Sequence, residues 1–202
     1  MIPNAATNTQ LDTGMRPATR RNRTRERILV ESTRLFLAHG FAGVSVDAIV
    51  DAAGVARSSF YRFFSNRDDV ISSIIRPVFA SGMSMMQGLE RLPPRETMDG
   101  VFRVYLNLWT ADPAALQLTM RMGGSHFRLF DEGHHEFRRQ LTRLVRLVEP
   151  SGVLLNGSGD NTARIIARIA VSVLDIYRNE TDLETLYLQT MRGLLIKPEA
   201  SP

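Results

Sequence analysis

Residues 45–64 read SVDAIVDAAGVARSSFYRFF, and this stretch decides the fold. Ser45 is placed to cap a short helix whose apolar positions stop at Gly54. A second short segment follows over residues 57–64, in which Phe60 and Phe64 lie four residues apart and so share one face. Two short helices that flank a tight glycine turn predict a helix-turn-helix.

Helices of two turns are not stable alone, so these segments need a shared apolar core. Another helix precedes them, from near Thr24 to Gly40, because apolar positions there recur at spacings of three and four. The residues expected to meet in this core are Phe36, Phe41, Val46, Ile49, Val55, Phe60 and Phe64. The outer side chains of the second short helix are not needed for the core and could enter the major groove of DNA.

The remainder of the chain shows helical periodicity without convincing strand alternation, which predicts an all-α fold. Ser65 and Asn66 precede two acids and predict the start of a longer helix, which Pro77 should kink or interrupt. A capping box formed by Thr181 and Glu184 predicts the start of the last helix. The further helices are expected at about 95–110, from residue 113 to about 123, 131–148, 161–178 and 182–195.

These patterns predict three parts: an arm over residues 1–22, a helix-turn-helix domain over 23–70 and a larger helical domain over 71–202. The arm is Arg-rich and has no periodicity, so we expect it to be flexible. The whole net charge of +4 falls within residues 1–76, where eleven arginines face seven acidic residues. Such an asymmetric charge is typical of phosphate binding at the N-terminal end, and equally of a solvated, disordered tail.

Composition argues against several classes of site. The chain has no cysteine, so disulfides and thiolate metal sites are excluded. No apolar run approaches the roughly 20 residues of a membrane span, and the N-terminus lacks a signal-peptide pattern, so we expect a cytoplasmic protein that does not contact membranes. His134 and His135 are adjacent and lack the spacing of a helical zinc site. Without a recognisable nucleophile elbow or phosphate loop, neither catalysis nor a cofactor is expected.

Residues 24–70 resemble the N-terminal domain of the TetR/AcrR repressor family. The resemblance is carried by Leu35-Phe36, Gly40-Phe41, Ser45-Val46, Ile49, Ala53-Gly54-Val55, Phe60-Tyr61 and Phe64. It implies a homodimer that binds a near-palindromic operator in double-stranded DNA. The positions that would contact DNA are Thr24, Arg25, Ser45, Arg57, Ser58, Ser59, Tyr61, Arg62, Phe63 and Arg67.

Three positions depart from the family pattern. Ala56 stands where a capping Ser or Thr is usual, so the recognition helix should begin less firmly. Phe63 stands where His is common in the family, so the DNA base preferred at this position is left open. Arg67 stands where lysine is common, near the start of the next helix. Arg57 and Arg62 could bind guanine edges, whereas Tyr61 is expected to contact phosphate or sugar. The alternative for Tyr61 is partial burial beside Phe36.

Residues 71–202 are the part that the family leaves variable. Two wide apolar faces near the C-terminus exceed what a small monomer needs, and in similar proteins the last two long helices form a four-helix dimer interface. The expected interface residues are Ile165, Ile169, Val173, Tyr177, Leu183, Leu186, Tyr187, Thr190 and Leu194. Soft and aromatic side chains suggest a cavity for a small apolar or aromatic effector. The expected cavity residues are Met86, Phe102, Tyr105, Trp109, Met120, Met122 and Phe130.

Three alternatives remain open beside a ligand-released repressor. A helical enzyme would need a convergent catalytic group, and a non-specific nucleoid-type binder would need a basic surface throughout. The neutral larger domain argues against the second. An activator, or a constitutive repressor without an inducer, has the same sequence features.

Overall fold

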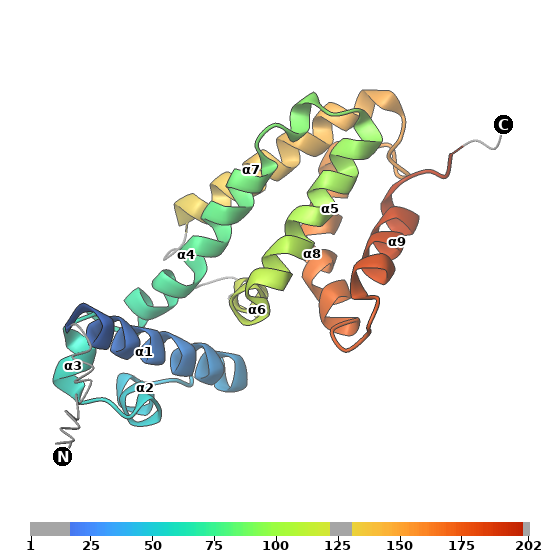
Figure 1. The fold of residues 1–202 in the computed structure, drawn as a ribbon. Coiled ribbons are helices and arrows are strands. Elements are labelled where there is room, and N and C mark those ends of the chain that lie inside the picture. Colours follow the sequence, from blue (N-terminus) through green and yellow to red (C-terminus); the bar gives the residue numbers. More distant parts are fainter. Residues whose placement is uncertain (1–16, 122–130, 200–202) are drawn as a thin grey trace, which may run out of the picture.

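Helices form almost the whole of the computed structural model (Figure 1), which describes residues 17–121 and 131–199. Within those residues the extended pairing is limited to an isolated bridge between Leu154 and Ile196. The all-α fold expected from the periodicity is therefore confirmed. The elements are α1 Pro17–His39, α2 Val46–Ala53, α3 Arg57–Tyr61, α4 Arg67–Met86, η1 Leu89–Arg91, α5 Pro94–Ala111, α6 Pro113–Arg121, α7 Asp131–Val148, η3 Glu149–Ser151, α8 Gly159–Ile176 and α9 Leu183–Leu195.

The small N-terminal unit consists of α1, α2 and α3, which lie together at the lower left of Figure 1. Helix α1 begins at Pro17, before the end of the arm expected at residue 22. Residues 17–22 continue the helix in which Ile28, Leu35 and Phe36 are buried. A run of arginines is compatible with a helix because arginine has high helix propensity.

Helix α4 joins the small unit to the larger domain, where it lies beside α7 (Figure 1). Asn66 caps it, since its side chain accepts a bond from the Asp69 backbone N–H at 2.9 Å. Pro77 lies inside α4 without ending it, contrary to the expected interruption. The proline is exposed, and the helix lacks the hydrogen bond that an N–H at this position would donate to the Ser73 carbonyl.

The larger domain packs α4 to α9 around α5, whose inward face is almost entirely buried. Two ion pairs tie α9 to α5, one of them between Glu184 and Arg103 at 2.6 Å. The capping box expected at Thr181 and Glu184 is not formed: Asp182 is the N-cap residue and makes no side-chain cap bond. Glu184 instead makes a tertiary contact with an arginine 81 residues away.

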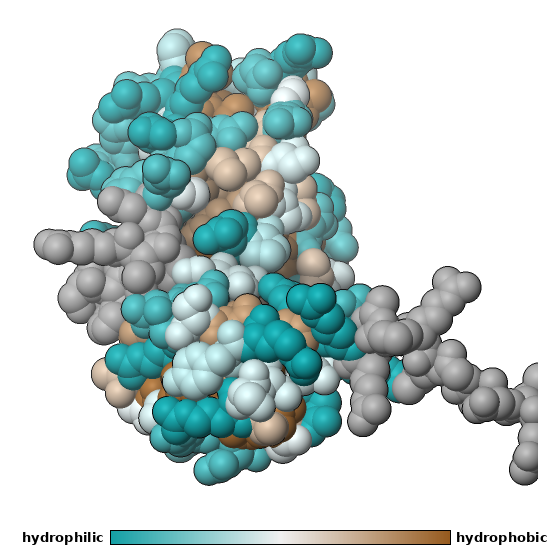
Figure 2. Space-filling view, turned by 90° about the vertical axis from the view of Figure 1, so that its left-hand side faces the viewer, coloured by the Kyte–Doolittle hydropathy of each residue, from teal (hydrophilic) through white to brown (hydrophobic). Residues whose placement is uncertain are grey.

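Figure 2 shows the face that lies to the left in Figure 1. Hydrophilic residues dominate its upper and lower parts, and apolar residues gather across the middle.

No helix in the described ranges is long and apolar enough to span a bilayer.

Candidate nucleic-acid interface and ligand cavity

The turn between α2 and α3 is held from both sides. Ser45 caps α2 by accepting a bond from the Ala48 N–H at 3.1 Å. Gly54 ends α2 in the left-handed region, with φ of 58°, where glycine has no Cβ penalty. From α1, the Arg27 guanidinium donates to the carbonyls of Ala53 and Gly54. The orientation of α3 relative to α1 and α2 is thus fixed at the turn itself.

An aromatic core supports α3 from below. Phe36, Phe41, Ile49, Phe60 and Phe64 are all buried, as expected, whereas Val46 and Val55 are half-buried at its edge. The rings of Phe60 and Phe64 lie 5.8 Å apart and those of Phe36 and Phe41 5.5 Å apart. Ala56 provides no side-chain cap, in agreement with the sequence. A helix of five residues, Arg57–Tyr61, therefore depends on this packing for its stability.

The outer face of α3 carries polar and aromatic groups. Arg57, Ser58 and Arg62 are exposed, and Tyr61 is 48% exposed rather than buried beside Phe36. The Arg57 guanidinium lies 5.7 Å from the Tyr61 ring centroid and within 3.5 Å of its hydroxyl.

Arg57 also pairs with Asp47 of α2, a contact for which the sequence offered no signal. The hydrogen bond with Tyr61, and next the charge of Asp47, raise the pKa of Arg57 above its ordinary value. The guanidinium is thereby held at the surface where α2 and α3 meet.

Arginines from the start of α1 extend this surface. Arg21 and Arg62 place their guanidinium carbons 5.7 and 5.5 Å from the Phe63 ring centroid, and Arg25 lies 5.5 Å from that of Phe64. Phe63 is half-buried between cations from two helices. The structure thus joins the basic start of α1 to the end of α3 in one positive surface, suited to the phosphate backbone. Of the other expected contacts, Ser45 is exposed, and Ser59 and Thr24 are half-buried.

Arg67 differs from the other expected DNA contacts because its guanidinium is used inside the protein. Its Nη1 donates to the carbonyls of Val44 at 2.9 Å and Phe41 at 3.2 Å. A longer contact to Ala42 measures 3.4 Å. The guanidinium also stacks 4.5 Å from the Phe41 ring centroid. Arg67 therefore connects the start of α4 to the loop between α1 and α2.

A cavity of about 50 Å³ lies within the larger domain, between α4, α5, α6, α7 and α8. Of the expected cavity residues, Tyr105 and Met120 line it. Met86, Phe102 and Trp109 are buried in the core but do not line it, and Met122 and Phe130 lie outside the described residues. The remaining lining residues were not expected: Val78, Phe79, Leu108, Leu116, Thr119, His134, Phe137, Arg138, Ala167 and Val171.

The apolar faces of α8 and α9 are only partly used inside the protomer. Leu194 is 52% exposed and Ile176 is 73% exposed. Ile165, Ile169, Tyr177, Leu183, Leu186 and Thr190 are half-buried, and the Tyr177 and Thr190 hydroxyls bond at 3.0 Å.

Two expected interface residues are already buried in the protomer. Val173 is 9% exposed, and Tyr187 has no exposed surface. The Tyr187 hydroxyl donates to the Phe102 carbonyl at 3.2 Å. Tyr187 is therefore a core residue that connects α9 to α5.

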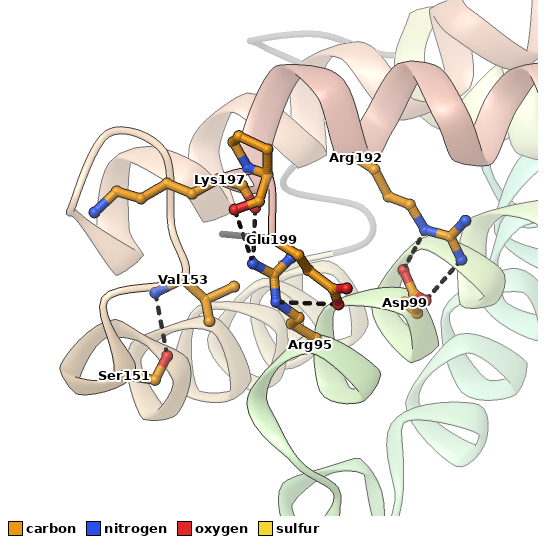
Figure 3. Close-up of polar contacts among 8 residues, drawn as sticks. Arg95, Asp99, Ser151, Val153, Arg192, Lys197 and Glu199 are labelled. Atoms are coloured by element: carbon orange, nitrogen blue, oxygen red, sulfur yellow. Dashed lines mark hydrogen bonds and ion pairs between the residues drawn. The ribbon is translucent and has the colours of Figure 1, made fainter. Parts of the chain in front are cut away.

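A charged groove of about 470 Å³ lies where α5, α9 and the C-terminal segment meet (Figure 3). Arg192 forms two bonds with Asp99, at 2.8 and 2.7 Å. Arg95 donates to the Lys197 carbonyl at 2.9 Å and lies 3.8 Å from Glu199. Arg192 and Arg95 are thus each paired with an acid, and the contacts of Arg95 fasten the segment after α9 to α5.

Comparisons with known proteins agree with this architecture. The family model described as "Bacterial regulatory proteins, tetR family" matches residues 28–74. The transcriptional regulator TcmR of Streptomyces glaucescens is 32% identical over 88 residues, which are 42% of this chain and 38% of TcmR. The putative mycofactocin biosynthesis regulator MftR of Mycobacterium tuberculosis is 37% identical over 70 residues, 35% of this chain and 33% of MftR. The chain thus matches less than half the length of these curated relatives.

Solved structures resemble the chain over most of its length. SCO3833, a member of the TetR regulator family from Streptomyces coelicolor, superposes with a TM-score of 0.71 at 18% identity, covering 83% of this chain and 88% of SCO3833. SmeT in complex with triclosan superposes with a TM-score of 0.58 at 21% identity, covering 89% of this chain and 99% of SmeT. The similarity in fold therefore covers much more of the chain than the 88 and 70 residues that match the curated relatives in sequence.

Proposed function

We propose that this chain belongs to the TetR family of bacterial regulatory proteins, whose model matches residues 28–74, and that it is a ligand-responsive transcriptional repressor. In this proposal it acts in the cytoplasm and binds a near-palindromic operator as a homodimer. A small apolar or aromatic effector releases it from DNA. An activator would share the DNA-binding surface and differ in its effect on transcription. A repressor without an inducer would share the surface and lack the response to ligand.

The observation that carries the proposal is the exposed face of α3 above a buried aromatic core. Arg57, Tyr61 and Arg62 project from a short helix that the Arg27 contacts and the packing of Phe60 hold in place. This is the geometry of a recognition helix in the major groove, with arginines able to bind guanine edges. The positive surface formed with Arg21 and Arg25 would bind the adjacent phosphates.

Dimerisation in this proposal uses α8 and α9. Ile176 and Leu194 leave large apolar side chains exposed on these helices, and a two-fold pair would bury them. The two copies of α3 must then reach half-sites about 34 Å apart on one face of B-DNA.

Release would pass through α4 and α6. Leu116, Thr119 and Met120 of α6 line the cavity, and Arg121 at the end of the same helix donates to the Leu37 carbonyl of α1 at 2.5 Å. A molecule larger than the cavity would displace α6 and thereby change the position of α1. The coupling would need about 1–3 kcal/mol to change operator occupancy. The triclosan complex of SmeT supports a small-molecule effector in this fold.

Selection of bound duplexes from random DNA tests the first half of the proposal. We expect the full chain to enrich a palindrome and to protect it from nuclease on one face, with a solution mass of two subunits by light scattering. An Arg57→Gln variant should bind the preferred sequence more weakly while retaining the dimer. A monomeric chain, or one with no preference among duplexes, would overturn the proposal.

The regulatory half is tested with a reporter gene under the selected operator. Repression that an effector relieves supports the proposal. Activation of the reporter, or repression unchanged by every molecule that binds the purified chain, favours the alternatives.

A further inference from the structure

Only a few residues supply polar groups to the cavity that lies between α4, α5, α6, α7 and α8. Eight of its twelve lining residues are apolar, and the rest are Tyr105 from α5, Thr119 from α6, and His134 and Arg138 from α7. No carboxylate lines the cavity among the described residues. The cavity wall therefore offers hydrogen-bond donors and one permanent positive charge without a resident anion.

Arg138 is half-buried, and its guanidinium makes no hydrogen bond or ion pair with any residue in the described ranges. Its neighbour on α7 is different, because Arg139 is exposed and pairs with Glu136. Partial burial of an uncompensated charge costs free energy, which an anion of suitable shape would recover.

Tyr105 provides a second donor to the same cavity. Its side chain is 4% exposed, and its hydroxyl makes no hydrogen bond within residues 17–121 and 131–199. Burial raises the pKa of Tyr105 well above its ordinary value, and the positive charge of Arg138 acts in the opposite sense. The phenol thus keeps its proton at neutral pH, and the guanidinium is close enough to affect it electrostatically.

From this juxtaposition of Arg138 and Tyr105 we infer that the effector is a carboxylic acid with a compact apolar or aromatic body. The inference rests on the proposed function, since it takes this cavity as the effector site. The planar guanidinium binds a carboxylate through two parallel N–H bonds, and the Tyr105 hydroxyl adds a third donor.

The remaining walls would enclose the apolar body of the acid. Phe79 and Phe137 lie with ring centroids 5.9 Å apart and tilted by 52°, a geometry that accepts another ring at their edges. The cavity of about 50 Å³ must expand to admit such a molecule. Met120, which is 38% exposed, is an unbranched side chain that can move aside.

Calorimetric titration of the full chain without DNA tests the inference. The probes are phenylacetate and cinnamate, each compared with its amide, which has the same shape and no charge. The variants are Arg138→Gln and Tyr105→Phe, with Arg139→Gln as the matched control on the adjacent residue. Circular dichroism verifies that each variant is folded, and Arg138→Lys, which keeps the charge, replaces Arg138→Gln if that variant unfolds.

We expect at least one acid to bind wild type and Arg139→Gln with a Kd below about 1 mM and at least about tenfold more tightly than its amide. Arg138→Gln should abolish this preference, Arg138→Lys should reduce it, and Tyr105→Phe should weaken acid binding several-fold. Equal binding of acid and amide overturns the inference. A preference that survives in Arg138→Gln, or one undiminished in Arg138→Lys, also overturns it, as does the failure of both acids to bind.

Operator binding by the same preparations is measured separately by fluorescence anisotropy. A chain that binds acids through Arg138 but selects no duplex refutes the proposed function alone. A chain that selects an operator but does not distinguish acid from amide refutes this inference alone.

Discussion

Replacing Arg67 by alanine should destabilise the DNA-binding unit without reducing the number of phosphate contacts. Nη1 has two hydrogens, so two of its three carbonyl contacts act at a time. The side chain is 35% exposed, so each bond contributes about 1 kcal/mol, which is below the range of about 1.5–3 kcal/mol for bonds to charged groups. Stacking on Phe41 adds about 0.5–1 kcal/mol. The expected loss is therefore about 2.5–3 kcal/mol in the free energy of unfolding.

Urea unfolding followed by circular dichroism measures this loss. The salt dependence of operator affinity, measured at a temperature where the variant is folded, then counts its phosphate contacts. We expect the slope of log K against log salt to be unchanged in Arg67→Ala. The exposed Arg25 offers a control, because Arg25→Ala should change stability by less than about 0.5 kcal/mol and reduce the slope.

The opposite pattern would refute this reasoning. A phosphate ligand at position 67 predicts a slope smaller in magnitude by about 0.9 with little change in stability. Such a result would mean that the carbonyl contacts of Arg67 are exchanged for DNA on binding.

Three further predictions concern the recognition helix, the turn and pH. Arg57→Gln should weaken selected-operator binding by about 1–3 kcal/mol in an anisotropy titration and leave the circular dichroism unchanged; undiminished affinity would remove Arg57 from base recognition. Gly54→Ala should lower the melting temperature more than Gly157→Ala: both positions have positive φ, but only at Gly54 would the new Cβ meet an arginine, at 2.9 Å. Equal shifts would argue against that contact. The bond with Arg146 lowers the pKa of Asp160, so its contribution to stability is present at neutral pH and lost as pH falls from the ordinary value through the depressed one. Asp160→Asn should thus destabilise the chain at pH 7 and progressively less as the pH falls through the depressed pKa of Asp160, and a loss independent of pH would contradict this.

Local patterns in the sequence were sufficient for the helix-turn-helix. The signals for it depend on contacts within one or two helical turns, which the sequence pattern shows directly. They are the cap at Ser45, the glycine at Gly54 and the four-residue spacing of Phe60 and Phe64. The structure confirms the aromatic core and leaves Tyr61 at the surface. The sequence predicted the helix caps less well. The carboxylate of Glu184 can bond to its own helix or to a distant arginine, and the sequence pattern does not say which.

Tertiary structure alone decided which groups meet across the chain. Arg67 is bound to carbonyls 23 to 26 residues away, and Arg57 to a carboxylate ten residues away. Tyr187 lies on an apolar face, and a helical period cannot distinguish a face that packs within the protomer from one that is left exposed. The ligand cavity depends on the same kind of information, since Arg138 reaches it only through the packing of α7 against α4, α5 and α8. Helical periodicity specifies which side of each helix is apolar, and only the packing of all the helices specifies what that side contacts.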